Sequence, residues 1–308
     1  FADDGRFLDS FGAQGTREED GPFFERPYSV AQAENGDIFV VDSWNYQIRR
    51  FAENYTQILK WGSPVTSGFE ALTIPEDGFW GPRDIAIDSL GRIYVSDTGN
   101  KRVRVYEADG TYLHDIGSGG SGDGQLNESS GIAIHPDGRL FVADTWNRRI
   151  AVFSLDGAHL YSFSVRAWYE EQGNRPYLAI DPERELLYVT DPDAGRVLIY
   201  STAGDCLSSF GQYNAQSPDA GQFATVGGID VDDDGNVYVS DLTAGRILKF
   251  DPYNPPIVIP EVSEEVQDDG MSNNGAVEAL AGEIEVTPEV GPEITPELET
   301  TEEMESRG

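Results

Sequence analysis

Hydrophobic and polar residues alternate with a period of two in short runs along most of the chain. Within residues 81–110 (GPRDIAIDSLGRIYVSDTGNKRVRVYEADG) the alternation predicts three strands, at 84–88, 92–97 and 101–106, followed by a fourth at 112–116. Each run is rich in β-branched residues, is too short for a helix and is bounded by Gly, Asp or Asn. The pattern therefore predicts a four-stranded antiparallel unit joined by tight turns.

The same unit recurs along the chain. An aspartate ends the second strand of every unit, and successive aspartates are 55, 47, 47 and 50 residues apart: Asp42, Asp97, Asp144, Asp191 and Asp241. An aromatic residue closes the third strand each time: Phe51, Tyr106, Phe153, Tyr200 and Phe250. A repeat of this length with four strands is typical of propeller blades. We therefore predict an all-β fold, a β-propeller of four-stranded antiparallel blades, over residues 1–252.

The two ends of the repeat region predict how the ring closes. Phe1 aligns with Tyr106, so that residues 6–11 match a fourth strand, whereas the last unit stops at Phe250 without one. We expect residues 6–11 to pair with the last unit, which closes a ring of five blades and removes its free sheet edges. The alternative is a ring of six blades, in which a further unit lies upstream of Phe1.

Acidic residues dominate the composition. The chain has 55 Asp and Glu against 21 Lys and Arg, a net charge of −34, and residues 253–308 contribute 15 acids and one Arg. That segment is rich in Pro, Glu and Thr, and we expect an acidic, disordered tail. An acidic body repels phosphates, so nucleic acid is not an expected partner. No apolar run approaches the roughly 18 to 20 residues of a membrane helix, so we expect no direct membrane insertion of this segment.

The residues that follow the second strand resemble a known repeat. Three units carry Asp, a Ser or Thr, any residue and Asn ahead of the third strand: 42–45 (DSWN), 97–100 (DTGN) and 144–147 (DTWN). They are similar to the NHL repeat, whose name records an Asn-His-Leu core; Asn45, Asn100 and Asn147 match, while His and Leu are replaced. The units at Asp191 and Asp241 have Ala-Gly-Arg instead and diverge. The resemblance implies the propeller fold, but this fold hosts enzymes, RNA binders and adaptors alike.

The repeated aspartates are predicted to be structural. A carboxylate at a strand end can accept backbone N–H bonds from the turn that follows, and Asn three residues later tolerates the left-handed conformation. Because all five aspartates recur at the same place, we do not expect any of them to be catalytic. The sequence also has no Gly-x-Ser-x-Gly motif and only one cysteine, Cys206.

One loop matches a calcium-binding pattern. Asp230, Asp232 and Asp234 precede Gly235, and Asp241 stands at the twelfth position. The pattern makes these carboxylates candidate calcium ligands, although the repeat alone would supply an Asp-Gly turn at this point. The NHL resemblance also implies an alternative function, a divalent-metal-dependent lyase or lactonase-like enzyme. The three histidines, His114, His135 and His159, fall on parts of the blades that point apart, so a three-histidine zinc site is not expected.

A binding surface is the better-supported expectation. In a propeller the turns between second and third strands share one face with the loops between blades. That face would gather seven aromatic and basic residues: Tyr28, Trp44, Trp80, Arg83, Trp146, Arg175 and Tyr177. Indole rings in exposed turns, together with arginine, suit contacts with a protein, a peptide or a glycan. We therefore expect a non-catalytic binding module. Two glycosylation sequons, at 54–56 and 127–129, are compatible with an extracytoplasmic location, but such triplets are common by chance, so the sequence leaves the location open.

Overall fold

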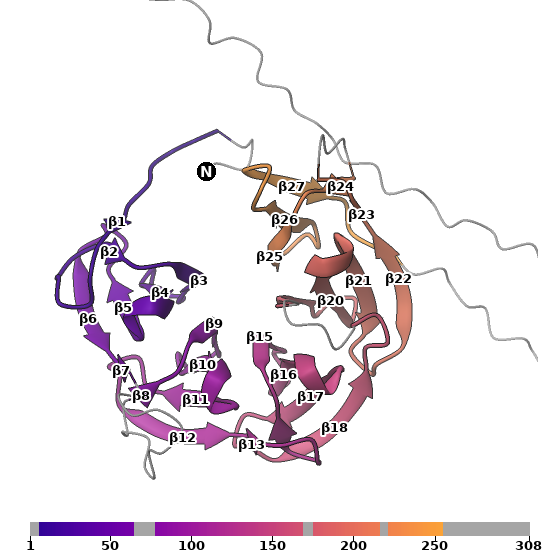
Figure 1. The fold of residues 1–308 in the computed structure, drawn as a ribbon, viewed down its shortest axis with the longest axis horizontal. Helices are drawn as coiled ribbons and strands as arrows, with labels where there is room; N and C mark the ends of the chain where they lie inside the picture. The colour runs from indigo at the N-terminus through magenta and orange to yellow at the C-terminus, as the bar shows by residue number, and fades with distance from the viewer. Residues whose placement is uncertain (1–5, 65–77, 169–174, 216–220, 255–308) are drawn as a thin grey trace, which may run out of the picture.

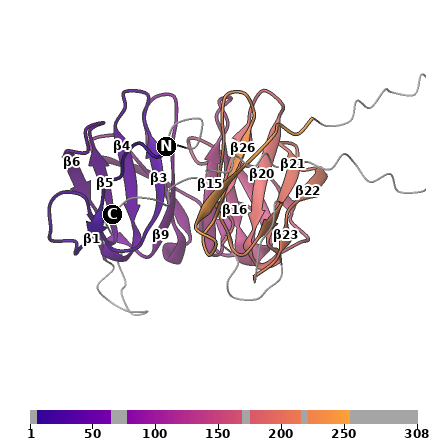
Figure 2. The ribbon, with the colours of Figure 1, turned by 90° about the horizontal axis from the view of Figure 1, so that it is seen from above.

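The structure is a ring of five β-sheets. It is a computed structural model that describes residues 6–64, 78–168, 175–215 and 221–254. Seen down the ring, the sheets stand around a central opening, with the first strand of each sheet innermost and the last outermost (Figure 1). Seen from the side, the strands run across the thickness of a disc (Figure 2). The prediction of a five-bladed β-propeller is confirmed.

We number the sheets blade 1 to blade 5 in chain order. Blade 1 contains β3 (Pro27–Gln32), β4 (Ile38–Asp42), β5 (Gln47–Phe51) and β6 (Gln57–Trp61). Blade 2 contains β9 (Pro82–Ile87), β10 (Ile93–Asp97), β11 (Arg102–Tyr106) and β12 (Tyr112–Ile116). Blade 3 contains β15 (Ser129–Ile134), β16 (Arg139–Asp144), β17 (Arg149–Ser154) and β18 (His159–Ser164). Blade 4 contains β19 (Leu178–Asp181), β20 (Leu186–Asp191), β21 (Arg196–Ser201) and β22 (Cys206–Phe210). Blade 5 contains β25 (Val226–Val231), β26 (Val237–Asp241) and β27 (Arg246–Phe250).

Short elements connect these strands. Four parallel two-stranded ribbons are β1 (Ala13–Gln14) with β2 (Phe23–Phe24), β7 (Ser63–Pro64) with β8 (Gly78–Phe79), β13 (Ser118–Gly119) with β14 (Gln125–Leu126), and β23 (Gln212–Tyr213) with β24 (Gln222–Phe223). Single 3₁₀ turns join the second and third strands of four blades: η1 (Ser43–Asn45), η2 (Thr98–Asn100), η3 (Thr145–Asn147) and η4 (Pro192–Ala194). Across the described ranges there is no α-helix, and no helix has the length and apolar character needed to cross a membrane.

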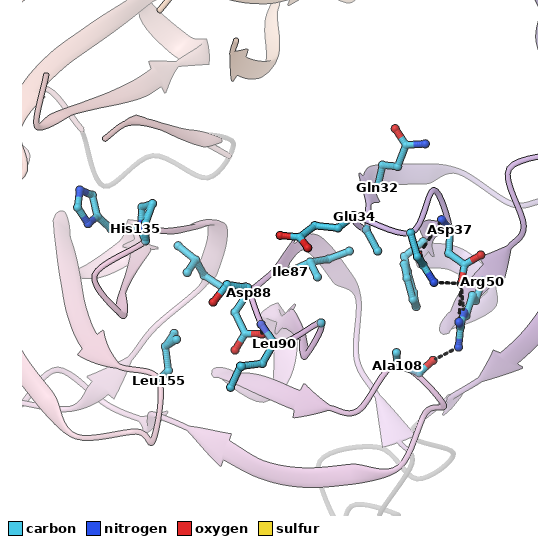
Figure 3. Close-up of a pocket in the computed structure, with 17 residues that line it drawn as sticks. Gln32, Glu34, Asp37, Arg50, Ile87, Asp88, Leu90, Ala108, His135 and Leu155 are labelled. Atoms are coloured by element: carbon cyan, nitrogen blue, oxygen red, sulfur yellow. Dashed lines mark hydrogen bonds and ion pairs between the residues drawn. The ribbon is translucent and has the colours of Figure 1, made fainter. Parts of the chain in front are cut away.

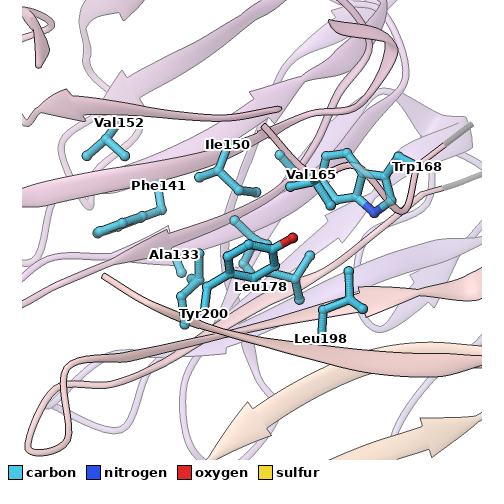
Figure 4. Packing of buried hydrophobic residues seen from close by; sticks show 12 residues of the cluster. Ala133, Phe141, Ile150, Val152, Val165, Trp168, Leu178, Leu198 and Tyr200 are labelled. Atoms are coloured by element: carbon cyan, nitrogen blue, oxygen red, sulfur yellow. The ribbon is translucent and has the colours of Figure 1, made fainter. Parts of the chain in front are cut away.

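The hydrophobic core lies between neighbouring blades. Successive side chains of a strand point to opposite faces, so a sheet can bury one row of apolar residues against each neighbouring blade. The described apolar clusters fill the four spaces between blades 1 and 2, 2 and 3, 3 and 4, and 4 and 5. Between blades 3 and 4, Phe141, Ile150 and Val152 pack with Leu178 and Tyr200, and the indole of Trp168 covers one end (Figure 4). Burying one such side chain completely contributes about 1.5–3 kcal/mol to stability.

A buried aspartate braces each blade. Asp97 accepts hydrogen bonds from the backbone N–H of Trp80 (2.7 Å), from Nδ2 of Asn100 (2.7 Å) and from Nε of Arg102 (3.0 Å). The same three kinds of donor surround two further aspartates: Glu25, Asn45 and Arg49 bond Asp42, and Asn127, Asn147 and Arg149 bond Asp144. The expected structural role holds, but the N–H comes from the loop before the blade's first strand. The carboxylate therefore ties that loop to the turn after the second strand. We call the aspartate, with its backbone, asparagine and arginine donors, the bracket of the blade.

The residue with the left-handed backbone differs from the predicted one. It is the residue after the asparagine, with φ of 57° at Tyr46, 58° at Lys101 and 53° at Arg148. The divergent blades place Gly195 and Gly245 there. The asparagine itself ends the 3₁₀ turn, and its side chain is needed to donate to the aspartate. The sequence therefore correctly predicted an asparagine in this turn. It wrongly predicted that the asparagine adopts the left-handed conformation.

The expected closure by the N-terminal strand is wrong. Residues 6–12 form no strand, and within the described chain the sheet of blade 5 ends at β27. Phe11 instead packs on blade 1, with its ring stacked 4.4 Å from that of Tyr55 and edge-on to that of Phe51. Residues 1–5 and the predicted tail, apart from residues 253 and 254, lie outside the described residues.

We predict that breaking the bracket of blade 1 is strongly destabilising. Asp42 and Arg49 are both fully buried, with Nε and Oδ2 2.8 Å apart. Asp42→Asn leaves that guanidinium without its counter-charge, which should cost about 3–5 kcal/mol of unfolding free energy, measured by urea denaturation. Asn45→Ala removes one buried donor and should cost about 1–3 kcal/mol.

The matched control is Asp123→Asn, at an exposed position in the loop before blade 3. It should change the unfolding free energy by less than about 0.5 kcal/mol. An Asn45→Ala variant as stable as this control would show that the bracket does not hold the blade.

Candidate functional site

Four of the predicted binding residues meet at one end of the central channel. Tyr28 is the second residue of β3 in blade 1 and Arg83 the second residue of β9 in blade 2, and Arg175 and Tyr177 lie within three residues before β19 in blade 4. The Tyr177 hydroxyl donates to the backbone carbonyl of Tyr28 at 3.2 Å, which links blades 149 residues apart in sequence. The Arg83 guanidinium lies 5.1 Å from the centre of the Tyr28 ring. With Glu128, which precedes β15, we call these residues the channel-mouth cluster.

Two positive charges lie close together in the channel-mouth cluster. Burial lowers the pKa of Arg83, the positive charge of Arg175 lowers it further, and Tyr28 and Glu128 act in the opposite direction. Nε of Arg83 is buried and has no hydrogen-bond partner among the described residues. A planar guanidinium with a free donor suits a carboxylate or another anion. The cluster can therefore accept a negatively charged group.

A buried carboxylate lies next to this cluster, and sequence reasoning missed it. Oδ1 of Asp84 accepts from the Ser29 hydroxyl (2.6 Å), and Oδ2 accepts from the N–H of Ile132 (2.8 Å). Asp84 of blade 2 thus bonds blades 1 and 3. Burial raises its pKa to about 6; the bonds from Ser29 and Ile132 oppose this shift, and the charge of Asp230 adds to it. The available signal was an aspartate at an inner-strand position where other blades have small residues, such as Gly131 and Gly228.

The three predicted tryptophans lie on the turns and loops of individual blades. Trp44 in η1 and Trp146 in η3 are about half exposed, and Trp80 precedes β9. The Arg26 guanidinium lies 4.0 Å from the Trp44 ring centre, within the same blade. The Trp80 ring packs directly on Gly99, where an added Cβ would lie 2.6 Å from Cγ of the indole. Their part in ligand binding stays a prediction.

The predicted calcium ligands are used within their own hairpin. Asp232 accepts hydrogen bonds from Asn236 and from the Tyr238 hydroxyl (3.1 Å), and Asp230 accepts from the N–H of Val231. Throughout the described ranges, no three His, Cys, Asp or Glu side chains are placed to hold a metal ion. The calcium pattern in the sequence therefore coincides with the tight turn of a blade, and the geometry adds no support for a bound ion.

The opposite end of the channel holds a cavity that the sequence did not indicate. It has a volume of about 450 Å³ and lies among the first hairpins of blades 1 to 3 (Figure 3). Asp37 forms an ion pair with Arg50, which also donates to the carbonyl of Ala108 at 2.8 Å. On the other side, His135 lies 2.8 Å from Asp137. These polar side chains are already paired with one another, so the cavity is a weaker candidate for ligand binding than the channel mouth.

Comparisons with known proteins agree with this architecture. The family model of the NHL repeat matches residues 79–106 and 126–153, which are units of blades 2 and 3. The human NHL repeat-containing protein 3 is 28% identical over 89 residues, which make up 28% of this chain and 23% of that protein. The chain thus spans about a quarter of the length of this curated relative.

Solved structures share the fold at low identity. Virginiamycin B lyase from Staphylococcus aureus has a TM-score of 0.50 and 13% identity, over 74% of this chain and 71% of the lyase chain. A chain of the nidogen/laminin complex has a TM-score of 0.53 and 20% identity, over 73% and 75% of the two chains. At these identities the likeness shows the fold alone.

The ring of radial sheets and the buried bracket at each second strand define a β-propeller built from tandem repeats. Two of its blades contain units that match the NHL repeat, at residues 79–106 and 126–153. The resemblance noted from the sequence is confirmed, and the family model matches two of the three units expected to be regular.

We predict that Asp84 makes stability depend on pH between about 4 and 6. Its pKa is raised from 3.8 to about 6 in the folded chain, so over this interval the folded state binds more protons than the unfolded state. The contribution of Asp84 to stability therefore falls as pH rises, by up to about 3 kcal/mol. Asp84→Asn has no titrating proton and should remove this dependence; its Oδ1 can accept from the N–H of Ile132, and its Nδ2 can donate to the Ser29 hydroxyl oxygen, which reverses that bond.

The measurement is the difference in unfolding free energy between Asp84→Asn and the parent chain at pH 4 and at pH 7. The variant should gain relative stability at the higher pH, whereas Asp123→Asn should show a constant difference. Parallel curves for Asp84→Asn and the parent chain would contradict the assignment.

Proposed function

We propose that this chain is a non-catalytic binding module that recognises a peptide segment carrying a carboxylate at the channel mouth. The observation that carries the proposal is the buried Nε of Arg83, which has no hydrogen-bond partner among the described residues and faces the second positive charge of Arg175. An incoming carboxylate would provide the missing acceptor and relieve the repulsion between the two guanidinium groups.

The surroundings of Arg83 support a specific contact. The ring of Tyr28 lies beside the guanidinium, and the hydrogen bond from Tyr177 holds that part of blade 1 against blade 4. The guanidinium is therefore held in place before a ligand arrives, which lowers the entropy cost of binding. The net charge of −34 acts against polyanions, so a single carboxylate within a less acidic segment is favoured over nucleic acid.

Exposed indoles supply the apolar part of the proposed surface. Trp44 and Trp146 lie at turns on the same face as the starts of the first strands, outside the channel-mouth cluster. Partly exposed tryptophan and arginine are the residue types that most often dominate binding energy in protein interfaces. A chain of this fold in the nidogen/laminin complex supports the use of such a scaffold in protein association, without identifying a partner here.

A metal-dependent lyase or lactonase-like activity is the second candidate, favoured by the fold shared with virginiamycin B lyase. The described residues hold no group of three potential metal ligands, so this candidate has less support from the site. Zinc or calcium that stays bound in stoichiometric amount after dialysis would favour the enzyme over the binding module.

We predict that Arg83→Gln weakens ligand binding by about 10- to 100-fold, as expected for loss of a hydrogen bond to a charged group. The probes are arrays of acidic peptides, the same peptides with amide side chains, and acidic and neutral glycans. Binding of the acidic peptides should exceed that of their amide counterparts, and Arg83→Gln should remove the difference.

Arg92→Gln is the matched control, because Arg92 pairs with Asp88 in the hairpin at the other end of blade 2. It should leave peptide binding unchanged. Equal binding of acidic and amide peptides by the parent chain would refute the carboxylate preference, and selective binding of glycans would show a different class of ligand.

A further prediction concerns the indoles. Trp44→Ala combined with Trp146→Ala should abolish binding of the selected peptide while the melting temperature changes little, because both rings are about half exposed. A large fall in melting temperature would show instead that the rings stabilise their turns.

A further inference from the structure

A groove lies between the outer strands of blades 3 and 4, which stand away from the central channel in Figure 1. It has a volume of about 660 Å³, a size typical of sites for small molecules. Its lining comes from β18 of blade 3, from the two residues that follow Val165, and from the hairpin of β21 and β22 in blade 4. We call it the outer groove.

At three other interfaces a buried side chain fills the corresponding space. The parallel ribbons before blades 2, 3 and 5 each contribute one apolar residue that is 0% exposed and stands 18 positions before the repeated aspartate: Phe79, Leu126 and Phe223. Each packs on a glycine after the last strand of the preceding blade, where an added Cβ would lie 2.6–2.7 Å from a carbon of that side chain: Gly62, Gly117 and Gly211. These three interfaces are therefore closed at this point.

The sequence before blade 4 lacks both features. The position 18 residues before Asp191 is Gly173, which has no side chain to fill the space, and Ser164 stands where the other blades have the packed glycine. The indole of Trp168 covers one end of this interface (Figure 4), but it does not line the outer groove. The outer groove thus follows from the residue types at this interface.

The arginine that pairs with the repeated aspartate also differs in blade 4. In four blades its terminal nitrogens donate to backbone carbonyls of the preceding loop: Arg49 to Glu19 (2.8 Å), Arg102 to Gly78 (3.2 Å), Arg149 to Gln125 (2.7 Å) and Arg246 to Gln222 (2.7 Å). Arg196 donates through Nε to Asp191 at 2.9 Å, and no described residue accepts from its terminal nitrogens. Its side chain is 35% exposed and lines the outer groove, so these donors are open to a ligand.

A second arginine lines the same end of the outer groove. The N–H of Val165 donates to the carbonyl of Arg148 at 2.9 Å, which places Arg166 at the end of blade 3 where its third strand begins. Arg196 begins the third strand of blade 4 at the equivalent point. None of the described residues that line the groove is acidic, although the chain as a whole has a net charge of −34. This end therefore favours an anion.

The wall that leads away from the arginines is apolar. Leu198 and Tyr200 follow Arg196 at steps of two along β21, so their side chains point to the same face of the sheet. The ring of Phe163 lies 5.5 Å from that of Tyr200. Cys206 pairs with Tyr200 at the far end of the groove, four residues and about 13 Å along the strand from Arg196.

We propose that the outer groove binds a free amphipathic monocarboxylate, such as a medium-chain fatty acid. Its carboxylate bonds Arg196 and Arg166, because a planar guanidinium matches the two oxygens of a carboxylate. Its apolar chain lies along Leu198 and Tyr200 and ends near Cys206. A ligand with one charge and an apolar body matches a lining in which the cations are confined to one end. This inference does not depend on the proposed function.

The experiment uses Cys206 as a reporter, because it is the one cysteine of the chain and is exposed. The rate of its alkylation by iodoacetamide is measured against the concentration of decanoate and, separately, of 1-decanol, which has the same chain without the charge. Decanoate should slow the alkylation in a saturable manner, by at least ~10-fold. Decanol should need a concentration at least ~10-fold higher, as expected for loss of hydrogen bonds to a charged group.

Two variants test the two ends of the contact. Arg166→Gln should weaken the protection by decanoate about 5-fold, since Arg166 is exposed. Ser209 pairs with Leu198, so its side chain points to the same face, and Ser209→Trp should fill the groove and make the alkylation rate independent of decanoate. Arg92→Gln, at the far end of blade 2, is the control and should leave the protection unchanged.

Equal protection by decanoate and decanol would overturn the proposal, because the arginines would then contribute nothing. So would an alkylation rate that decanoate does not change. Protection by a peptide carboxylate such as N-acetyl-Phe-Leu, without protection by decanoate, would overturn the assignment of a free acyl chain.

Discussion

The structure depends on one recurring interaction, the buried carboxylate that ends the second strand of each blade. In blades 1 to 3 this carboxylate bonds an N–H from the loop before the first strand, an asparagine in the 3₁₀ turn and an arginine in the third strand. Three segments of one blade are thus fixed to a single side chain. Burial raises the pKa of Asp97 and of Asp144, so the bonds must offset a real cost of desolvation. Because a buried charge without its partners is strongly destabilising, the bracket specifies where each segment lies.

This interaction explains why so much of the fold could be predicted from the sequence. The bracket, the turn and the alternation of the strands each depend on residues within about 30 positions of one another. Each therefore appears as a pattern in a short stretch of sequence, and the pattern recurs along the chain. The strands of blade 2 were predicted to within two residues of their observed bounds. The backbone partner of the aspartate was not predicted, because it lies 17 residues earlier in a loop whose sequence varies. The left-handed residue was misplaced by one position, because tyrosine, lysine and arginine carry no signal for that conformation.

The candidate site could be predicted less well, because its residues come from different blades and their contacts are not encoded by neighbouring positions in the sequence. Tyr28 and Tyr177 were both expected on the binding face, yet nothing in the sequence indicated that they bond each other across the channel. Asp84 was missed because its meaning depends on blades 1 and 3, which supply Ser29 and Ile132. The sequence also predicted closure between residues 6–11 and blade 5, since both ends were deficient. The prediction failed because a spare strand at one end of the chain and a missing strand at the other do not show that the two ends lie close enough to pair.

The channel mouth and the open side of the ring, between blades 5 and 1, are separate parts of the molecule (Figure 1). The channel-mouth cluster draws its residues from blades 1 to 4, and the open faces belong to blades 5 and 1. Blade 1 forms one link between them, since Tyr28 and Val30 lie on the same strand; Tyr28 is its bulged residue, and its ring lies beside the guanidinium of Arg83 in blade 2, whereas Val30 is exposed. Asp230 of blade 5 forms the other link, because its charge contributes to the raised pKa of Asp84. A change at the open faces would therefore reach the site through blade 1 and through this carboxylate, whereas Arg83 and Arg175, which we propose accept an anion, belong to blades 2 and 4.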